Sequence, residues 1–477
     1  MLQKEVKVLL LSLLVTSGLI GIGIWLFLPG ISNLTGVNTS ANNQETNNNN
    51  QSETSVKERI SFGEKIFSPG EASQLKEDGA KAIADKNYQQ AIAKFTESLK
   101  LKPNDPEALI YLNNARIGSS QNSTKNYTIV ATVPLGNNSN TGLEILRGIA
   151  QAQNEINTNG KINGAYLKVG IANDDDDPEI SQQIATNLVK NPEVLGVVCC
   201  NTSDATLTAG TVYNSGKLVA ISPISTSVKI TNFSPYIFRT VPSDFIAART
   251  LANYMVKNLQ KKKAAVFFNS QSGYSQSLKS EFVSSILLEG GEISKEFDLS
   301  KADFSAASSL KQATEQGAQV LMLAANTGIL DKALQVVQVN QKRLTLLGGD
   351  DVYTLKTLEI GREQAVGMVL AVPWHIQGNP KSEFPKTSRK LWGADVSWRT
   401  ALAYDATKAF IAALGKDPTR SGIQKTLVSP GFSATGAGGE IRFLPSGDRN
   451  TSVQLVKIVP GSRSRTGYDF EPISPRN

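Results

Sequence analysis

Buried-strand patterns alternate with amphipathic-helix patterns through most of the chain. The apolar runs Thr128–Val133 and Tyr166–Ala172 are each followed by a helical pattern, Thr141–Asn157 and Glu179–Lys190 respectively. Regular alternation of this kind is typical of parallel sheets that are covered by helices on both faces. Because the alternating region spans roughly 350 residues, more than one core usually holds, the sequence predicts two α/β lobes.

Two polar loops each follow a predicted strand in the stretch from Leu195 to Asp244. The first loop, Asn201–Ala205, comes after the apolar run Val194–Cys200, and the second, Ser222–Ser227, comes after Leu218–Ile221. In an open parallel sheet, ligands bind beyond the carboxyl ends of the strands, where backbone N–H groups and hydroxyls can surround a small anion. The two loops therefore predict a binding crevice.

The N-terminal segment has the composition of a membrane span. Val8–Leu28 is an uncharged apolar run of about twenty residues, the length that a helix needs to cross a bilayer. Lys4 and Lys7 precede this run, so the charge distribution predicts a cytoplasmic N-terminus and an extracytoplasmic remainder. We expect an uncleaved membrane anchor over residues 1–30, and a cleaved secretion signal is the alternative.

Two further segments read as linkers. Asn, Gln, Thr and Ser dominate Asn33–Glu53, which has too few apolar residues to form a core, so residues 31–70 are expected to be a disordered tether. Residues 461–477 are expected to be a C-terminal tail.

Short amphipathic helix patterns occupy residues 71–117. Gly79, Ala91, Phe95 and Pro103 resemble the tetratricopeptide repeat, in which small residues let paired helices approach and an aromatic ring fills the groove. Asp78 departs from that pattern. Since about three repeats are normally needed for independent stability, the unit should lean on a neighbour or self-associate. Two interpretations of residues 72–117 are compatible with the sequence: a spacer and a protein-binding module.

The only two cysteines, Cys199 and Cys200, are adjacent in the sequence. A disulfide between neighbours would need a strained ring with Cα atoms closer than the usual range, so we expect two buried thiols at a strand end.

A series of short motifs runs in a fixed order through residues 126–460: VPLGNNSNTG, NDDDDPEISQQIATNLV, VVCCNTSDATLTAGTVY, AISPISTS, YIFRTVPSD, FFNSQSGYSQS, LLGGDDVY and GEIRFLPSGD. Together they resemble the type I periplasmic binding proteins, specifically the leucine/isoleucine/valine-binding family of amino-acid receptors. The resemblance implies a Venus-flytrap fold of two doubly wound lobes, preceded here by the all-α repeat-like unit and the transmembrane helix.

The resemblance also implies a bipartite ligand site. The α-carboxylate of the ligand would contact Ser203 in the first polar loop and Ser225 and Thr226 in the second. The α-ammonium would contact Asp350, with Asp351 as its competitor. The residues themselves allow a plainer interpretation, in which the hydroxyls cap helices or turns and one of the carboxylates begins the next helix.

Further positions of the cleft follow from the same resemblance. Tyr274 would line the cleft, although an exposed loop aromatic is the alternative. Thr141 occupies a side-chain-pocket position where many members carry an aromatic residue, which leaves the ligand's side chain open. The chain would first cross between lobes at a hinge formed by Arg239, Thr240, Val241 and Pro242.

Other classes of site fit poorly. Asp174–Asp177 lacks the alternating ligand spacing of a calcium loop and is expected to be a solvated turn. His375 is the only histidine and no serine-nucleophile motif is present, so we expect no enzyme, metal site or cofactor. The net charge of +7 includes no long basic run beyond Lys261–Lys263, which argues against nucleic acid.

Two functions are therefore expected from the sequence. The first is a membrane-tethered extracytoplasmic receptor that binds an amino acid or similar zwitterion for an ABC-type permease. The second is a sensory or scaffolding receptor whose repeat-like unit binds a protein partner.

Overall fold

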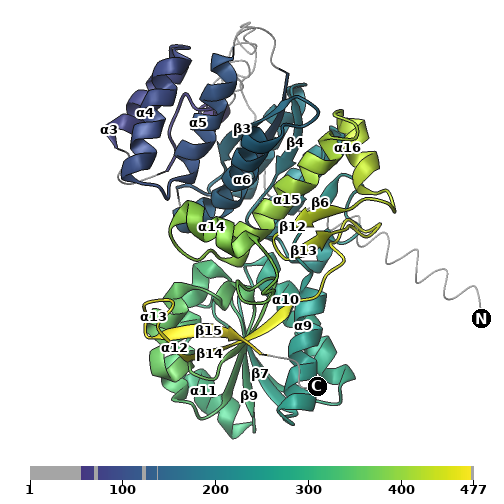
Figure 1. The fold of residues 1–477 in the computed structure, drawn as a ribbon. Coiled ribbons are helices and arrows are strands. Elements are labelled where there is room, and N and C mark those ends of the chain that lie inside the picture. The colour runs from purple at the N-terminus through teal and green to yellow at the C-terminus, as the bar shows by residue number, and fades with distance from the viewer. Residues whose placement is uncertain (1–54, 69–72, 121–124, 137, 474–477) are drawn as a thin grey trace, which may run out of the picture. The chain divides into compact units, whose positions relative to one another are not determined.

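The computed structural model of the chain describes residues 55–68, 73–120, 125–136 and 138–473. Within these residues, two large sheets are each flanked by helices, which confirms the predicted α/β architecture (Figure 1). The anchor predicted at Val8–Leu28 lies outside the described residues. Among the residues that are described, no helix combines the length and the apolar composition of a membrane span.

The first lobe is built on a six-stranded sheet. All neighbouring strands are parallel except the edge pair, which is antiparallel. The strands, in spatial order, are β1 (Ile60–Ser61), β3 (Tyr166–Asn173), β2 (Asn126–Val133), β4 (Val194–Val198), β5 (Ala220–Ser222) and β6 (Ile237–Arg239).

Helices cover both faces of this sheet because its strands send apolar side chains alternately to two cores. In β2, Ile129 and Ala131 belong to one core, whereas Val130 belongs to the other. The helices of the first core are α5 (Pro106–Ser119), α6 (Ser139–Asn159) and α15 (Trp398–Leu414), and those of the second are α7 (Pro178–Lys190) and α8 (Ser203–Ser215).

The second lobe has a seven-stranded sheet with α9 (Asp244–Asn253) and α10 (Gly273–Leu288) on one face, and α11 (Ala306–Glu315), α12 (Leu330–Asn340) and α13 (Leu355–Ala365) on the other. Its strands, in spatial order, are β15 (Tyr468–Pro472), β14 (Gln454–Pro460), β11 (Val369–Val372), β10 (Thr345–Gly348), β9 (Val320–Ala324), β7 (Lys263–Phe268) and β8 (Glu292–Asp298).

A strand, β15, lies within residues 461–473, which belong to the segment 461–477 that was expected to be a tail. Strand β15 pairs antiparallel with β14 and closes one edge of the second sheet. Phe470 is buried there against the second-lobe core. Burial of this apolar side chain stabilises a strand in a segment whose composition is typical of a loop.

The chain passes between the two lobes three times, at residues 240–243, 373–383 and 442–453. After the second crossing it returns to the first lobe and adds α15 beside α6. The other elements of this return are α14 (Phe384–Trp392), α16 (Arg420–Leu427), β12 (Ala434–Gly436) and β13 (Gly439–Ile441).

The helical unit in front of the first lobe consists of α3 (Gln74–Ala84), α4 (Tyr88–Leu101) and α5, which pack beside one another (Figure 1). A Cβ atom at Gly79 would lie 3.0 Å from the ring of Phe95, so the helices approach closely only because this residue has no side chain. The unit is not a separate body, because its buried residues share one continuous core with the first lobe.

Residues 55–68, which belong to the tether expected over residues 31–70, include a strand. Ile60–Ser61 pairs with β3 as strand β1, and Asn114 of α5 bonds the backbone of Val169 on the same free edge of that strand. The Asn114 amide nitrogen donates to the carbonyls of Phe62 (2.9 Å) and Val169 (2.7 Å), and its oxygen accepts from the Val169 N–H (3.2 Å). One side chain thus takes the place of a neighbouring strand at an edge that needs protection.

We expect Asn114→Ala to lower the free energy of unfolding by about 2–4 kcal/mol, because it leaves several buried backbone groups of Phe62 and Val169 without partners. Urea denaturation of the full-length protein measures the loss. Asn113→Ala is the matched control, since the Asn113 amide donates only to its own helix and to Asn154. Equal losses in the two variants would contradict the edge-covering role of Asn114.

The adjacent cysteines correct another expectation. Cys199 and Cys200 form a disulfide, with Cα atoms 3.4 Å apart. Side chains of consecutive residues point to opposite faces in a regular strand, but β4 ends at Val198 and Cys200 has φ of 105°. The turned backbone brings the two side chains to the same side at the beginning of the loop that leads to α8.

Candidate ligand-binding site

Polar side chains from both lobes line a cleft of about 590 Å³ at the carboxyl ends of the strands. Its size is within the usual range for small-molecule sites. Five of the six residues predicted to bind ligand are among its lining residues: Ser203, Ser225, Thr226, Tyr274 and Asp350.

Thr141 is the residue that does not line this cleft. It lies in the first turn of α6 and is buried in the lobe. The cleft is lined instead by Asn138, the residue that precedes α6. Asn138 lies just outside the helix with φ of −136° and ψ of 52°, so the helical periodicity that buries Thr141 does not determine where the Asn138 side chain points.

The first-lobe side of the cleft presents groups that suit an anion. Thr202 caps α8 by accepting from the N–H of Ala205 (3.2 Å), which makes Ser203 the first helical residue rather than the cap. Among the described residues, the N–H groups of Ser203, Asp204 and Thr226 have no hydrogen-bond partner. Free N–H groups beside a helix N-terminus are favourable for a carboxylate.

Ser225 is turned toward the protein. Its hydroxyl pairs with that of Thr206 (2.7 Å) and lies 3.0 Å from the carbonyl of Thr202, and its N–H donates to the Ser222 hydroxyl (3.0 Å). Ser225 therefore holds the second loop against the start of α8.

The second-lobe side presents a buried carboxylate. Strand β10 ends at Gly348, and Asp350 follows within a 3-10 turn, η4 (Asp350–Val352). The hydroxyl of Tyr274 donates to Asp350 Oδ1 at 2.7 Å. A side chain at Gly349 would collide with that hydroxyl, so the glycine allows the tyrosine to reach the acid. The second oxygen of Asp350 has no hydrogen-bond partner among the described residues.

The environment of Asp350 opposes its ionisation. Burial raises its pKa to about 8, and the charges of Asp351 and Asp244 add to the rise, against the hydrogen bond from Tyr274 and the charge of Arg399. A cationic group placed in the cleft would stabilise the ionised form. A strongly shifted carboxyl in a cleft is a frequent property of functional sites.

Asp351, the competitor of Asp350 in the sequence, has another partner. Its Oδ1 accepts from Arg399 Nη2 at 2.7 Å, and its Oδ2 accepts from the Thr327 N–H at 3.2 Å. Arg399 comes from α15 in the first lobe, so this ion pair joins the two lobes. No motif in the sequence indicated Arg399, because the pair depends on how α15 returns to the first lobe.

Two more hydrogen bonds join the lobes beside the cleft. Asp204 of α8 accepts from the N–H of Gly273 at 3.0 Å, and the hydroxyl of Ser277 accepts from the N–H of Val228 at 3.0 Å. The helix start that faces the candidate carboxylate site is thus also in contact with the second lobe.

The turn at Asp174–Asp177 is solvated only in part, because its first residue is buried. Asp174 is fully buried and accepts from the Ser181 hydroxyl, while Asp177 caps α7. Asp175 and Asp176 have φ of 52° and 61°, and this left-handed turn directs Asp176 into the cleft. Sequence patterns do not report such dihedral angles.

The first crossing between the lobes is anchored to the first lobe and to the third crossing. The buried guanidinium of Arg239 pairs with Asp448 (Nε to Oδ1, 2.6 Å) on the third crossing and donates to the carbonyl of Ser227 (2.8 Å). Thr240 donates its hydroxyl to the Leu402 carbonyl (2.9 Å). Arg239 and Thr240 thus connect the first crossing to the third crossing and to α15.

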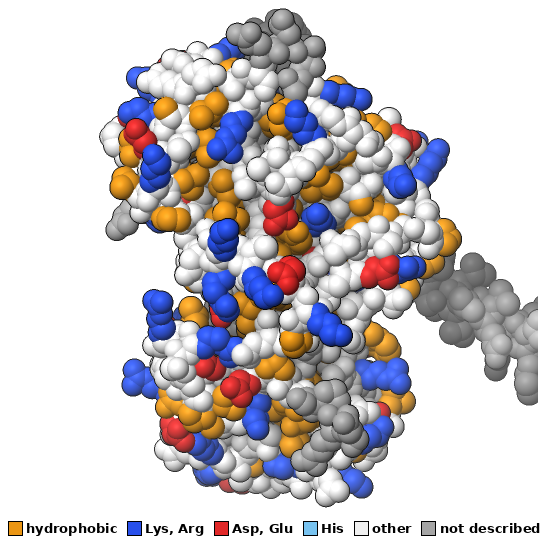
Figure 2. Space-filling view, in the orientation of Figure 1, with side chains coloured by type: hydrophobic (Ala, Val, Ile, Leu, Met, Phe, Trp, Pro, Cys, Tyr) orange, Lys and Arg blue, Asp and Glu red, His pale blue; other side chains and the backbone are white. Residues whose placement is uncertain are grey.

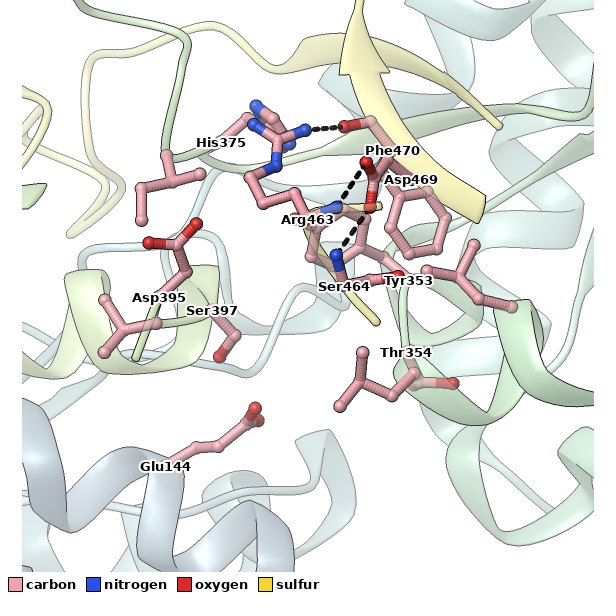
Figure 3. A pocket seen from close by; sticks show the side chains of 14 residues that line it. Glu144, Tyr353, Thr354, His375, Asp395, Ser397, Arg463, Ser464, Asp469 and Phe470 are labelled. Carbon is pink, nitrogen blue, oxygen red and sulfur yellow. Dashed lines mark hydrogen bonds between the residues drawn. The ribbon is translucent and has the colours of Figure 1, made fainter. Parts of the chain in front are cut away.

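A second cavity, of about 180 Å³, contains the only histidine (Figure 3). Burial lowers the pKa of His375 to about 4, so the ring is neutral at physiological pH. Arg463 donates to the Phe470 carbonyl (3.1 Å) and its N–H to Asp469 (2.9 Å), as Figure 3 shows. The cavity is too small for most ligand sites.

Comparison with known proteins agrees with this architecture. The sequence profile of the periplasmic binding protein family matches residues 131–463. A Leu/Ile/Val-binding protein homologue of Brucella melitensis is 25% identical over 327 residues, which are 66% of this chain and 86% of that protein. An amino acid binding protein of Pseudomonas aeruginosa is 32% identical over 150 residues, 31% of this chain and only 40% of that protein.

Solved structures show the same fold. A leucine-binding protein from Thermotoga maritima superposes with a TM-score of 0.63 at 21% identity, covering 73% of this chain and 99% of that one. A solute-binding protein of an ABC transporter from Rhodopseudomonas palustris, in complex with 4-hydroxybenzoate, has a TM-score of 0.63 at 18% identity, covering 73% of this chain and 96% of that one. With a profile match over most of its length and this fold, the chain belongs to the periplasmic binding protein family.

Proposed function

We propose that the protein is a solute-binding protein that holds an amino acid, or a similar small zwitterion, between its two lobes and delivers it to an ABC-type permease. The first lobe contributes Ser203 and Thr226 to the ligand's carboxylate, and the second contributes Asp350 to its ammonium. The relatives whose names refer to leucine, isoleucine and valine support an amino-acid ligand.

One observation carries this proposal: unpartnered N–H groups and an unpartnered carboxylate oxygen face the same cleft from opposite lobes. The N–H groups of Ser203 and Thr226 favour a negative charge, and Asp350 favours a positive one. A zwitterion satisfies both sides only when the lobes are together. The residues 239–242 are proposed as the hinge, since closure requires a few backbone dihedrals to change at each crossing.

The location follows from the family and the N-terminal sequence. Members of a periplasmic family act outside the cytoplasm, and the apolar run Val8–Leu28 supplies the proposed single-pass anchor. On the face in Figure 2, Lys and Arg side chains are scattered over the surface among other residues. That distribution favours a small-molecule ligand over nucleic acid.

The helical unit of α3, α4 and α5 is part of the structure of the first lobe. Its third helix, α5, is buried in the first-lobe core and covers the sheet edge through Asn114. This role favours the transport proposal over the alternative of a scaffolding receptor, in which the unit is free to bind a partner.

Calorimetric titration of the full-length protein with each of the common amino acids tests the proposal. Binding with micromolar affinity, about 8 kcal/mol, is the expected result for at least one of them. No heat of binding with any amino acid would refute it.

We expect the affinity for the bound amino acid to fall as the pH falls from 8 to 6, by up to about tenfold per unit. Asp350 has a raised pKa of about 8 in the empty cleft, and it must lose its proton to accept a charged hydrogen bond from the ammonium. Binding therefore releases a proton, and lower pH opposes that release. Titrations in two buffers with different ionisation enthalpies count the protons; a constant affinity over this range would contradict the role of Asp350.

A further inference from the structure

The ionisable side chains that line the cleft are all acidic. They are Asp176, Asp204, Asp350 and Asp351, and within the part of the chain that the structure describes no Lys, Arg or His lines the cleft. A zwitterion brings no net charge, so a cleft built for a neutral amino acid needs only one carboxylate opposite its free N–H groups. The surplus of negative charge indicates a ligand with an additional positive charge.

Two of these carboxylates already have partners. Asp204 accepts from the Gly273 N–H, and Asp351 is paired with Arg399. Asp350 is assigned to the α-ammonium by the proposed function. The remaining acid is Asp176.

Asp176 lines the cleft, and one of its carboxylate oxygens has no hydrogen-bond partner among the described residues. Its Oδ2 accepts from the amides of Asn201 (3.0 Å) and, more weakly, Asn138 (3.5 Å). Its Oδ1 is buried and has no hydrogen-bond partner among the described residues. A buried charged oxygen without a partner is costly, and a cationic ligand group would remove that cost.

The wall around Asp176 is unsuited to an aliphatic side chain. Asn138 and Asn201 flank it, and all three residues line the cleft. A leucine side chain in this position would cover their polar groups without replacing the lost hydrogen bonds to water. An ammonium or a guanidinium would instead donate several hydrogen bonds.

The carboxylates are too dispersed to share a metal ion. Among the residues that the structure describes, no group of three or more acidic, His or Cys side chains is arranged to hold one. Asp176 projects from the first lobe and Asp350 from the second. This separation suits a flexible ligand with two positive groups at different positions.

Burial raises the pKa of Asp176 to about 6, against the lowering effect of the hydrogen bonds from Asn201 and Asn138, and the charge of Asp351 contributes to the rise. The side chain therefore remains mostly ionised at pH 7.5.

We infer that the preferred ligand is a basic α-amino acid, whose side-chain cation binds Asp176 while its α-ammonium binds Asp350. The inference rests on the proposed function and adds the class of ligand. This cleft therefore differs from the cleft expected of a leucine receptor, because the group that selects the ligand's side chain is a carboxylate.

Calorimetry of the full-length protein at pH 7.5 tests this with matched pairs of ligands. L-Arginine is compared with its neutral analogue L-citrulline, and L-lysine with L-norleucine and L-leucine. We expect each basic amino acid to bind at least roughly thirtyfold more tightly than its neutral counterpart, the effect of one charged hydrogen-bonded pair.

The variants Asp176→Asn and Asp177→Asn locate the effect. Asp176→Asn should reduce arginine affinity to about that of citrulline while citrulline still binds, which shows that the cleft remains folded. Asp177→Asn is the control, because Asp177 lies outside the cleft lining and asparagine is an equally good helix cap. It should keep the preference for arginine.

The outcomes separate the inference from the proposed function. Neutral amino acids that bind as tightly as basic ones would refute the inference and leave the proposed function intact. A preference for arginine that survives Asp176→Asn would refute the role of Asp176. No binding of any amino acid would refute both.

Discussion

Asp350→Asn should weaken binding of the preferred amino acid by on the order of a hundredfold to a thousandfold, while the empty protein becomes more stable. The loss of affinity arises because the ammonium would be buried beside a neutral amide instead of a carboxylate, which costs about 3–4 kcal/mol. Calorimetry measures the affinity, and thermal unfolding without ligand measures the stability.

The opposite sign of the stability change follows from the pKa of Asp350. Its pKa in the folded state lies above the value in the unfolded chain, so the folded protein binds more protons than the unfolded chain between these two values. Stability then decreases as the pH rises through this range, and at neutral pH the carboxyl is destabilising. Replacing it with an amide should recover about 1–3 kcal/mol.

Asp331→Asn is the control for this variant, since Asp331 of α12 forms an exposed ion pair with Lys356 of α13. It should alter neither affinity nor stability measurably. Retained affinity in Asp350→Asn, or a clear loss of stability, would show that Asp350 serves the fold rather than the ligand.

Asp405→Ala should lower the free energy of unfolding by about 3–5 kcal/mol. Asp405 is fully buried in α15 and pairs with Arg449 on the third crossing, with Oδ2 and Nη1 2.6 Å apart. Asp405 also accepts from the N–H of Ala437 at 2.5 Å. Removing the carboxylate leaves a guanidinium buried without its counter-charge, which is among the most costly single changes.

Urea denaturation of three variants tests this prediction. Asp395→Ala, which breaks the more exposed pair with Arg389, should cost less than about 1 kcal/mol. The double variant Asp405→Ala/Arg449→Met should recover part of the loss, because it removes the unpaired charge as well. A loss in Asp405→Ala no greater than in Asp395→Ala would contradict the argument.

The sequence predicted the features that depend on local pattern. Strand and helix alternation reports which side chains are buried, so the two α/β lobes and the two polar loops at Asn201–Ala205 and Ser222–Ser227 could be anticipated. The LLGGDDVY motif likewise predicted an acid after a second-lobe strand; both acids line the cleft, and Asp351 is already paired with Arg399.

The features that the sequence did not predict depend on contacts between distant residues or on unusual dihedral angles. Arg399 meets Asp351 only because the chain returns to the first lobe after residue 383. Asp176 enters the cleft through a left-handed turn, and Cys200 joins Cys199 because its backbone departs from the strand. Strand β1 also escaped prediction, because its two residues are too few to give a sequence pattern and are held by pairing with β3.

The return of α15 to the first lobe determines when that lobe can finish folding. Phe410 and Trp398 of α15 are completely buried in a core that they share with α5, α6 and the first-lobe strands. During synthesis, the core of the first lobe can therefore be completed only after the central strands of the second lobe have been made. Such late completion keeps the growing chain from reaching its stable form early. A polypeptide that must be exported before it folds gains time in this way.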